Sequence, residues 1–523
     1  MIESILNVAN GNQQGGSLTA RAFLLMFAKV MAYVLGFALP LLLVRGLSQH
    51  DFGLYKQVFL VVSTALTVLP LGFSLSAYYF LPRESEERRG AVVFNILCFN
   101  IFVGGLVFIL LVLRPHLLAS LFGSAELVAY APLVGLVIML WMTSIFLEIV
   151  AIAGHEAQLA TVFIIAAQIT KTMLLVAAAA MFGSIRSLLY AALVQGILQN
   201  LVLFFYLRSR FPGFSHKANW GMMRVQLSYA LPIGLAGLVF GVLIDMHNYI
   251  VSYRFGASAF AVYAVGCFSL PLVNIVGDSF GVLLIPHISR LQKEGATREI
   301  VLVTAQTMRK LAFVYFPLYA FLVVAGREFI VVLFTERYLA SWPIFVVHMT
   351  TVPFFVLITD PIMRAHAEHR FFLLKIRAVT VVLLFLALWF GTLYFGLVGA
   401  ISIMVFFSLA DRFVETAKAW HIVKVTKRDI VLLKDVGKVG GAALAAGALT
   451  AVVRIFTAGQ KPLMVLAICS VAFGCAYLAI MWLLAVPTAQ EREALRNRIA
   501  RMQLPIWRKR IEPQVNAVES ALE

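Results

Sequence analysis

The sequence predicts an all-α polytopic membrane protein. Of its 523 residues, 62% are hydrophobic and 13% are charged, and the mean hydropathy is +0.93. A soluble protein would carry roughly twice this charged fraction. The first apolar run, 22–44, has Lys29 as its only charge and is long enough to cross a bilayer at about 1.5 Å per residue. Backbone polar groups in hydrocarbon must be satisfied within their own segment, so such runs form helices.

About fourteen such segments follow one another along the chain. The alternating apolar and polar pattern of a membrane β-barrel is absent from the sequence. The predicted spans are 19–44, 55–81, 91–113, 127–153, 159–182, 186–207, 225–250, 258–285, 311–335, 342–363, 373–393, 396–411, 438–456 and 463–486.

The connections between the spans are too short for a soluble catalytic domain. The phosphate-binding pattern Gly-x-x-x-x-Gly-Lys-Ser/Thr of ATP-hydrolysing proteins does not occur in the sequence. We therefore expect a protein that is not an enzyme.

The net charge of +17 is explained by topology. Most of the 42 Lys and Arg residues lie in the connections on the side of the N-terminus. Because cytoplasmic loops of membrane proteins are enriched in these residues, both termini are predicted to be cytoplasmic. No nucleic-acid partner is needed to explain the charge. Residues 1–18 lack the features of a cleaved signal peptide, so the first span is expected to be retained.

The chain contains two related halves. Phe52 and Tyr55 follow the first span, and Phe260 and Tyr263 follow the seventh, with one offset of 208 residues. Six spans lie within this offset, an even number, so the halves share one orientation. This arrangement predicts parallel repeats, which some transporters use for alternating access.

With these repeats, the chain is predicted to consist of six segments. They are a cytoplasmic N-terminal segment 1–18, an N-lobe 19–208, a cytoplasmic linker 209–224, a C-lobe 225–415, an additional hairpin of two spans 416–486, and a basic cytoplasmic tail 487–523.

Two lysines within spans are candidates for substrate binding. A charge at the centre of a bilayer costs about 2.5–3.5 kcal/mol on insertion scales, so it needs a structural or functional reason. Lys29 lies about a third of the way into span one, and Lys171 lies in the middle of span five. They would attract a phosphate-bearing substrate. The alternative is that each reaches the interface or is locally paired.

Two aspartates within spans are candidates for binding a coupling ion or relaying protons. Asp245 lies in span seven and Asp278 in span eight. Structural pairing with neighbouring helices is the alternative. The four cysteines lie within spans and have no metal-ligand spacing, so we expect packing residues, no metal site and no cofactor.

Four segments together resemble the Wzx-type polysaccharide transporters of the multidrug/oligosaccharidyl-lipid/polysaccharide (MOP) superfamily. They are 46–55, 245–263, 285–290 (Ile-Pro-His-Ile-Ser-Arg) and 326–338. The resemblance covers about residues 18–485. It implies two six-helix bundles around a central cavity that opens alternately to each side of the bacterial cytoplasmic membrane.

The resemblance also implies a function. Members of this family flip undecaprenyl-pyrophosphate-linked oligosaccharides from the inner to the outer leaflet for O-antigen, capsule or exopolysaccharide synthesis. The implied partners are this substrate, membrane lipids and, as candidates, the polysaccharide polymerase and chain-length machinery. Alternatives are a cation-coupled multidrug exporter, a lipid II flippase of the same superfamily, or a non-transporting scaffold subunit of a polysaccharide assembly complex.

Overall fold

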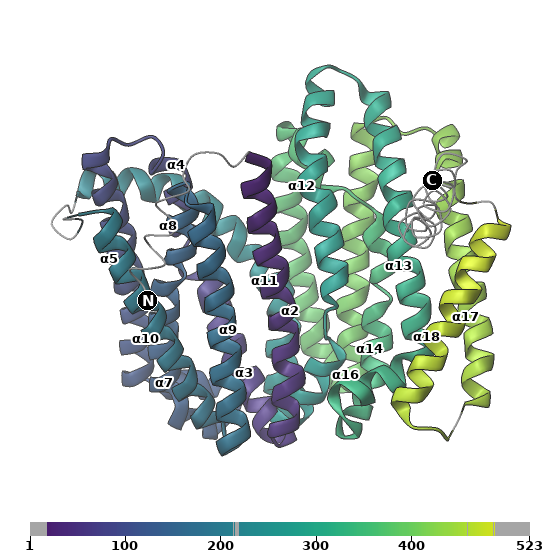
Figure 1. The fold of residues 1–523 in the computed structure, drawn as a ribbon, viewed down its shortest axis with the longest axis horizontal. Coiled ribbons are helices and arrows are strands. Elements are labelled where there is room, and N and C mark those ends of the chain that lie inside the picture. Colours follow the sequence, from purple (N-terminus) through teal and green to yellow (C-terminus); the bar gives the residue numbers. More distant parts are fainter. Residues whose placement is uncertain (1–17, 213, 215–218, 458, 485, 487–523) are drawn as a thin grey trace, which may run out of the picture.

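The protein is a bundle of long helices (Figure 1). The computed structural model describes residues 18–212, 214, 219–457, 459–484 and 486, and this part of the chain contains no β-strand. The predicted tail 487–523 and residues 1–17 lie outside the described residues. Eleven helices are long and apolar enough to cross a membrane, or up to 12 if a bent pair counts as one span. The predicted fold class is therefore confirmed.

The helices of the first half precede residue 211. They are α2 (Leu18–Gly46), α3 (Gln49–Val68), α4 (Ala77–Phe80), α5 (Glu86–Leu113), α6 (His116–Phe122), α7 (Ala131–Ser144), α8 (Phe146–Ala153), α9 (Ala157–Phe182) and α10 (Ile185–Arg210).

The helices of the second half begin at residue 220. They are α11 (Trp220–Gly266), α12 (Pro271–Lys293), α13 (Thr297–Phe334), α14 (Trp342–Met349), α15 (Asp360–Ala365), α16 (Arg370–Ile422), α17 (Lys434–Phe456) and α18 (Pro462–Leu483).

Helix α16 consists of two helical segments that join at Gly396, where the chain folds back on itself. Gly396 within it has φ 59° and ψ −153°, which is outside the helical region. Arg377 and Glu415 are 38 residues apart and form an ion pair of 3.0 Å. In a straight helix they would be about 57 Å apart. The segments on either side of Gly396 are therefore antiparallel, which is one reason why the candidate spans number fewer than the fourteen predicted. That count is not confirmed.

Helix α11 reverses in the same way at Gly256, where φ is 75° and ψ is 178°. His247 and Tyr263 lie on opposite sides of this residue, and their side chains are 2.8 Å apart. The first part of α11 is also bent, by 48° between Pro232 and Gly237. The bend divides this part of α11 into two segments, Trp220–Pro232 and Gly237–Gly266.

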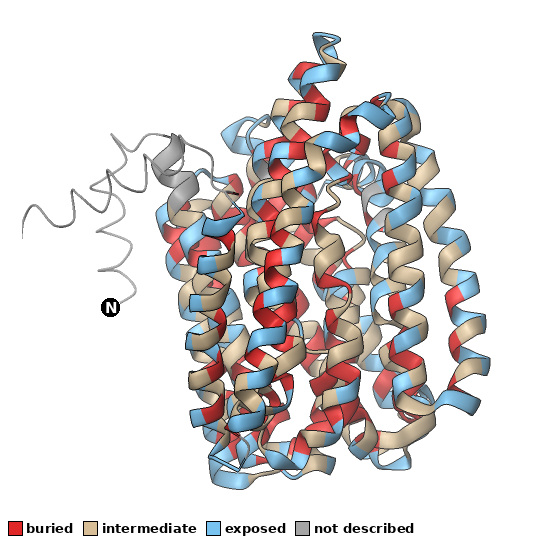
Figure 2. Cartoon of the chain, turned by 90° about the vertical axis from the view of Figure 1, so that its right-hand side faces the viewer, coloured by how far each residue is buried: buried red, intermediate tan, exposed pale blue. Residues whose placement is uncertain are grey.

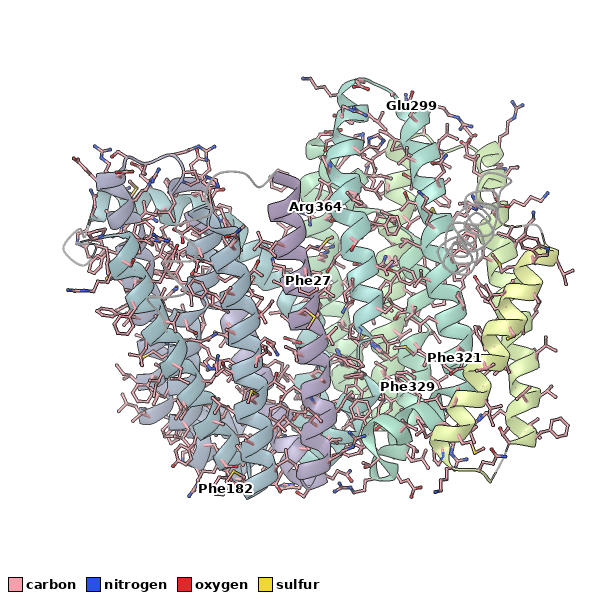
Figure 3. All side chains as sticks on the ribbon, in the orientation of Figure 1. Phe27, Phe182, Glu299, Phe321, Phe329 and Arg364 are labelled. Atoms are coloured by element: carbon pink, nitrogen blue, oxygen red, sulfur yellow. The ribbon has the colours of Figure 1, made fainter. Side chains whose placement is uncertain are left out.

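We name the two ends of the bundle from the topology. The inner end is the one at which α2 begins, and it is predicted to face the cytoplasm. The outer end holds Gly256, Gly396 and the turn between α17 and α18. Figure 3 shows Glu299 at the inner end and Phe182 at the outer end.

The same helix pairings occur in both halves of the chain. In the first half α2 packs on α9 and α5 on α7; in the second half α11 packs on α16 and α13 on α14. A parallel repeat requires such equivalent pairs. The hairpin of α17 and α18 packs on α13 at the edge of the bundle, at the right of Figure 1. The boundaries of the N-lobe, C-lobe and hairpin stay predictions.

Much of the apolar surface points outward. Of the apolar window within Phe371–Ile422, 11% of the residues are buried, against 61% for the window within Ala125–Ala153. Figure 2 shows exposed residues along the outer faces of the helices. Large side chains such as Phe102 and Phe395 are more than two thirds exposed. An apolar surface of this extent is expected where helices contact lipid.

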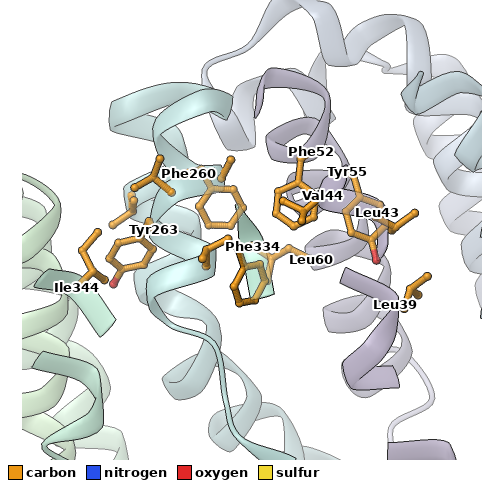
Figure 4. Close-up of a cluster of buried hydrophobic side chains, with 14 of the residues drawn as sticks. Leu39, Leu43, Val44, Phe52, Tyr55, Leu60, Phe260, Tyr263, Phe334 and Ile344 are labelled. Atoms are coloured by element: carbon orange, nitrogen blue, oxygen red, sulfur yellow. The ribbon is translucent and has the colours of Figure 1, made fainter. Parts of the chain in front are cut away.

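The buried core is shared at the outer end and divided at the inner end. At the outer end one cluster joins residues of both halves, including Phe52, Phe260 and Phe334 (Figure 4). Towards the inner end the core splits into two clusters. One contains Phe73 and Phe146 of the first half with Ala230 of α11, and the other contains Ile288 and Ile362 of the second half. The two halves are thus packed together at the outer end.

Helices α3 and α11 provide the closest contact between the halves. A Cβ on Gly53 would lie 1.9 Å from the carbonyl oxygen of Ala257, and a Cβ on Gly234 would lie 2.2 Å from that of Leu71. Membrane helices associate by such close approach at small residues because lipid offers no hydrophobic driving force between them. The buried Gln57 side chain also donates a hydrogen bond of 2.8 Å to Ser252 Oγ.

We expect Gly53→Ala to destabilise the protein. The added methyl group overlaps the backbone of Ala257, so the two helices must separate, at a cost of about 1–3 kcal/mol. Gly441→Ala in α17 is the matched control, because nothing lies within 4 Å of its Cβ position. The control should be neutral or slightly stabilising. Thermal unfolding of both purified variants in detergent measures the difference; equal melting temperatures would contradict the close contact.

Candidate functional site

The inner part of α11, before its bend, packs on the first half of the chain. Its buried residues, Gln226, Ala230 and Gly234, recur every fourth residue and form one narrow stripe. Gln226 accepts a hydrogen bond of 3.1 Å from Asn95, and Gly234 meets Leu71. Most other described side chains from 224 to 237 are exposed. The face of α11 that points away from the N-lobe is therefore exposed in this segment.

The outer end is closed by contacts between the two halves. Arg45, in the last turn of α2, donates a hydrogen bond of 3.1 Å to the carbonyl of Val332 in the last turn of α13. In return, Arg337 donates to the carbonyls of Val44 and Leu47 at 3.4 Å. Each arginine satisfies carbonyl groups at the C-terminal end of a helix of the other half, where a positive charge is favourable. The two halves are thus in direct contact at the outer end.

Lys29 is exposed and lies near a carboxylate. Its Nζ is 3.8 Å from Glu148 Oε1, and the two side chains are 58% and 39% exposed. An exposed ion pair contributes little to stability, so its partners can exchange at low cost. Lys29 is therefore available to an anionic ligand.

Lys171 is packed against a ring. Its Nζ lies 4.3 Å from the centre of the Trp141 ring, and Trp141 donates a hydrogen bond to the carbonyl of Ala192. A cation over an aromatic face is attracted by the electron density of the ring. This contact with Trp141 explains how the charge of Lys171 is tolerated within a span.

The structure does not bring the two lysines together. Gly36 of α2 lies beside Gln168 of α9, and Gly46 lies beside Ala179, so the helices run parallel in a fixed register. In this register Lys29 and Lys171 are separated by about ten residues, or ~15 Å along the helix axis. They belong to different levels of the N-lobe.

The two aspartates also have different surroundings. Asp245 Oδ2 accepts a hydrogen bond of 3.0 Å from Thr64 Oγ1, so it joins α11 to α3 between the halves. Asp278 is exposed on α12, and its neighbour Gly277 faces the hydroxyl group of Tyr315. Asp245 is therefore placed where the halves meet, whereas Asp278 is exposed on a helix of the second half.

A group of charges in the C-lobe was missed by the sequence analysis. Glu415 accepts hydrogen bonds from Arg377 at 3.0 Å and from Thr359 at 3.3 Å. The Arg377 guanidinium also lies 5.2 Å from the Phe240 ring of α11. The adjacent Arg412 donates to the carbonyl of Leu357.

The spacing of Arg377 and Glu415 about Gly396 in the sequence could have revealed this ion pair. Arg377 and Glu415 lie at equal distances on either side of Gly396, so any hairpin there brings them to the same level. The span boundary at residue 411 had placed Glu415 outside the membrane.

The charged side chains described above offer ion pairs and hydrogen bonds. Lys29 and Glu148 of the first half and Arg377 and Glu415 of the second half supply both signs of charge. Among the residues that the structure describes, no group of three His, Cys, Asp or Glu side chains is placed to hold a metal ion. The site is suited to binding a polar, charged molecule.

Comparisons with known proteins agree with this arrangement. The family described as "Polysaccharide biosynthesis protein" matches residues 42–343. Among curated proteins, none matches the sequence.

Three solved structures have a fold similar to that of this chain. A lipid II flippase MurJ in an inward closed conformation has a TM-score of 0.67 at 15% identity, covering 88% of this chain and 98% of its own. A MOP superfamily transporter from Pyrococcus furiosus has a TM-score of 0.55 at 15% identity, covering 78% and 96%. An inward-facing multidrug resistance MATE transporter has a TM-score of 0.53 at 14% identity, covering 80% and 98%.

We expect Glu415→Ala to destabilise the protein by about 2 kcal/mol, because it leaves Arg377 without its carboxylate partner in a largely buried position. The matched control is Asp360→Ala, which breaks the exposed ion pair with Arg364. That pair is more than half exposed on both sides, so its loss should cost less than about 1 kcal/mol. Unfolding of both variants in detergent gives the comparison, and a smaller loss for Glu415→Ala than for Asp360→Ala would contradict a buried pair.

Proposed function

Because this chain belongs to the polysaccharide biosynthesis protein family, on the match over residues 42–343, we propose that it is a flippase for a lipid-linked oligosaccharide. In this proposal it moves a polyprenyl-pyrophosphate-linked glycan from the inner to the outer leaflet of a bacterial cytoplasmic membrane, with both chain termini in the cytoplasm. The observations that carry the proposal are the family match and a helical bundle whose halves share one buried core at the outer end and have separate cores towards the inner end.

The lipid-linked substrate has three chemically different parts. The polyprenyl chain is apolar and remains in the lipid, whereas the diphosphate and the sugars must cross the membrane in a polar environment. Lys29 is an exposed cation near the inner end, and its carboxylate partner Glu148 is also exposed. We assign Lys29 to the diphosphate. Lys171, which lies deeper, would meet the diphosphate later in the cycle.

Alternating access requires the outer contacts to open as the inner halves come together. The arginine contacts at the outer end are few, and each is a hydrogen bond to a backbone carbonyl. The contact between α3 and α11 runs along the boundary between the halves, so it provides an axis about which the halves can rock. Asp245 lies on this axis with Thr64. We therefore assign Asp245 to the coupling ion or proton, and Asp278 is the second candidate.

Deletion of the gene in its host tests the function directly. We expect lipid-linked oligosaccharide to accumulate and surface polysaccharide to be lost. Unchanged glycans with new sensitivity to cationic drugs would instead favour a multidrug exporter.

We expect Lys29→Gln to lower the rate of flipping by about tenfold, the effect of losing one charge-assisted contact of about 1.4 kcal/mol with a phosphate. Lys461→Gln, at the exposed start of α18 near the outer end, is the matched control and should flip at the wild-type rate. Complementation of the deletion strain, with protein amounts checked by immunoblot, measures both. Full activity of Lys29→Gln would remove this residue from the substrate path.

We expect Asp245→Asn to remove the response of flipping to an ion gradient. The amide keeps hydrogen bonding to Thr64 but can neither release a proton nor attract a cation. Proteoliposomes with an imposed proton or sodium gradient measure the response, and Asp278→Asn in the same assay tests the second candidate. A variant that still accelerates under the gradient would exclude Asp245 from coupling.

A further inference from the structure

A short segment at the inner end of the second half exposes cations and apolar side chains together. It is the 3₁₀ helix η7 (Lys427–Leu433), which connects the inner end of α16 to the start of α17. Lys427 and Arg428 are exposed, and Ile430 and Val431 are 57% and 72% exposed. Two adjacent apolar side chains that are left uncovered beside cations form an amphipathic surface, which is typical of an interaction site.

The backbone of this segment is fixed on both sides. Helix α16 ends in a left-handed cap at Lys424, where φ is 52°. Thr426 and Asp429 then form a capping box at the start of η7. The buried Asp429 also accepts a hydrogen bond from Arg298 of α13. The segment is therefore held against the second half in one orientation.

The period of the 3₁₀ helix separates its inward and outward sides. With three residues per turn, every third residue lies on the same line of the helix. One line faces the protein: Asp429 is buried, and Leu432 packs against the inner core of the second half. The other two lines point outward. They form a surface that we call the basic patch, which consists of Lys427, Arg428, Ile430, Val431 and Lys434.

The cations of the basic patch are not neutralised by the protein. From residue 416 to residue 434 the sequence has five Lys or Arg residues and a single acidic residue, Asp429. Asp429 is already paired with Arg298. The next carboxylate, that of Asp435, lies 3.5 Å from Arg309. Within the part of the chain that the structure describes, the cations of the patch thus have no ion-pair partner and are available to an anion.

The length of α17 places the basic patch at the level of the lipid headgroups. Helix α17 has 23 residues and is therefore about 35 Å long. It spans the hydrocarbon of a bilayer, about 30 Å thick, without η7. Because η7 directly precedes α17, it lies at the membrane surface of the inner end. The hairpin to which it leads packs at the edge of the bundle, where lipid has access (Figure 1).

We propose that the basic patch binds anionic phospholipids in the leaflet at the inner end. The cations bind the lipid phosphates, and Ile430 and Val431 lie among the upper parts of the acyl chains. In a zwitterionic lipid the positive headgroup opposes this attraction, so anionic lipids are preferred. The bound lipids fix the depth of the α17–α18 hairpin in the membrane. This site is separate from the substrate path and does not depend on the proposed transport function.

The neighbouring inner turn, between α12 and α13, has a different composition. It also carries cations, Arg290 and Lys293, but Glu294 and Glu299 lie beside them, and Arg290 forms an ion pair with Glu294. Figure 3 shows Glu299 at this turn. The exposed side chains of residues 292–299 are polar or charged, as expected of a turn surrounded by water. Basic charge alone therefore does not define the basic patch.

The test compares binding of two lipids to the full-length protein in detergent by native mass spectrometry. Dioleoyl phosphatidylglycerol is the anionic probe, and dioleoyl phosphatidylcholine is the zwitterionic probe. We expect the first phosphatidylglycerol to bind about tenfold more tightly than phosphatidylcholine, the effect of one charge-assisted contact. The variant Lys427→Gln/Arg428→Gln/Lys434→Gln should reduce this preference to about twofold or less.

Two further variants separate the patch from general basicity. Arg290→Gln/Lys293→Gln/Lys310→Gln is the matched control, because it removes three other exposed cations from α12 and α13, and it should keep the preference. Ile430→Ser/Val431→Ser should weaken both lipids about equally, because apolar contacts do not distinguish the headgroups. An unchanged preference in the patch variant, or an equal loss in the control, would overturn the site. Equal binding of both lipids by the wild-type protein would also overturn it and would favour an acidic protein as the partner.

Discussion

The backbone contact between α3 and α11 is the constraint on which the rest of the structure depends. Gly53 and Gly234 allow the two helices to touch at both ends of the contact, and Gln57 and Thr64 add hydrogen bonds between these points. In a membrane, where water does not drive helices together, close packing and interhelical hydrogen bonds provide most of the attraction. This contact joins the two halves along their boundary and leaves their inner ends free to separate.

Helix α11 contacts both halves of the chain. Before the bend it packs on the N-lobe through Gln226; beyond the bend Asp245 and Ser252 are hydrogen-bonded to α3, and Arg254 contacts Trp389 of α16. The helix is bent between these two parts, at Pro232–Gly237. A proline within a helix removes one backbone hydrogen bond, so bending there costs less than elsewhere.

The charges within the spans occur in partnership. Lys29 lies near Glu148, Arg377 pairs with Glu415, and Lys171 lies over Trp141. Pairing reduces the cost of placing a charge in the membrane, and the degree of exposure then decides what each charge can do. The exposed Lys29 pair can exchange its partner for a phosphate, whereas the largely buried Arg377 pair fixes the two segments of α16.

The sequence by itself determined the class of fold and the family. Helices in lipid satisfy their own backbone hydrogen bonds, so each apolar run predicts a span without knowledge of its neighbours. The family resemblance, read from short segments such as 46–55 and 245–263, is confirmed by the match over 42–343. Lys29 and Asp245 stood out as charges within predicted spans, because a charge in an apolar run is visible locally; their roles stay predictions.

Only the tertiary structure decided which residues meet. A residue that faces lipid and one that faces the core are equally apolar, so hydropathy does not show which side of a span is buried. The fold-back of α16 at Gly396 pairs Arg377 with Glu415. The tertiary structure also places Lys29 and Lys171 at different levels of the N-lobe, although the sequence analysis had given both the same predicted role. These relations depend on chain reversals and helix register, which long-range packing sets and local sequence does not encode.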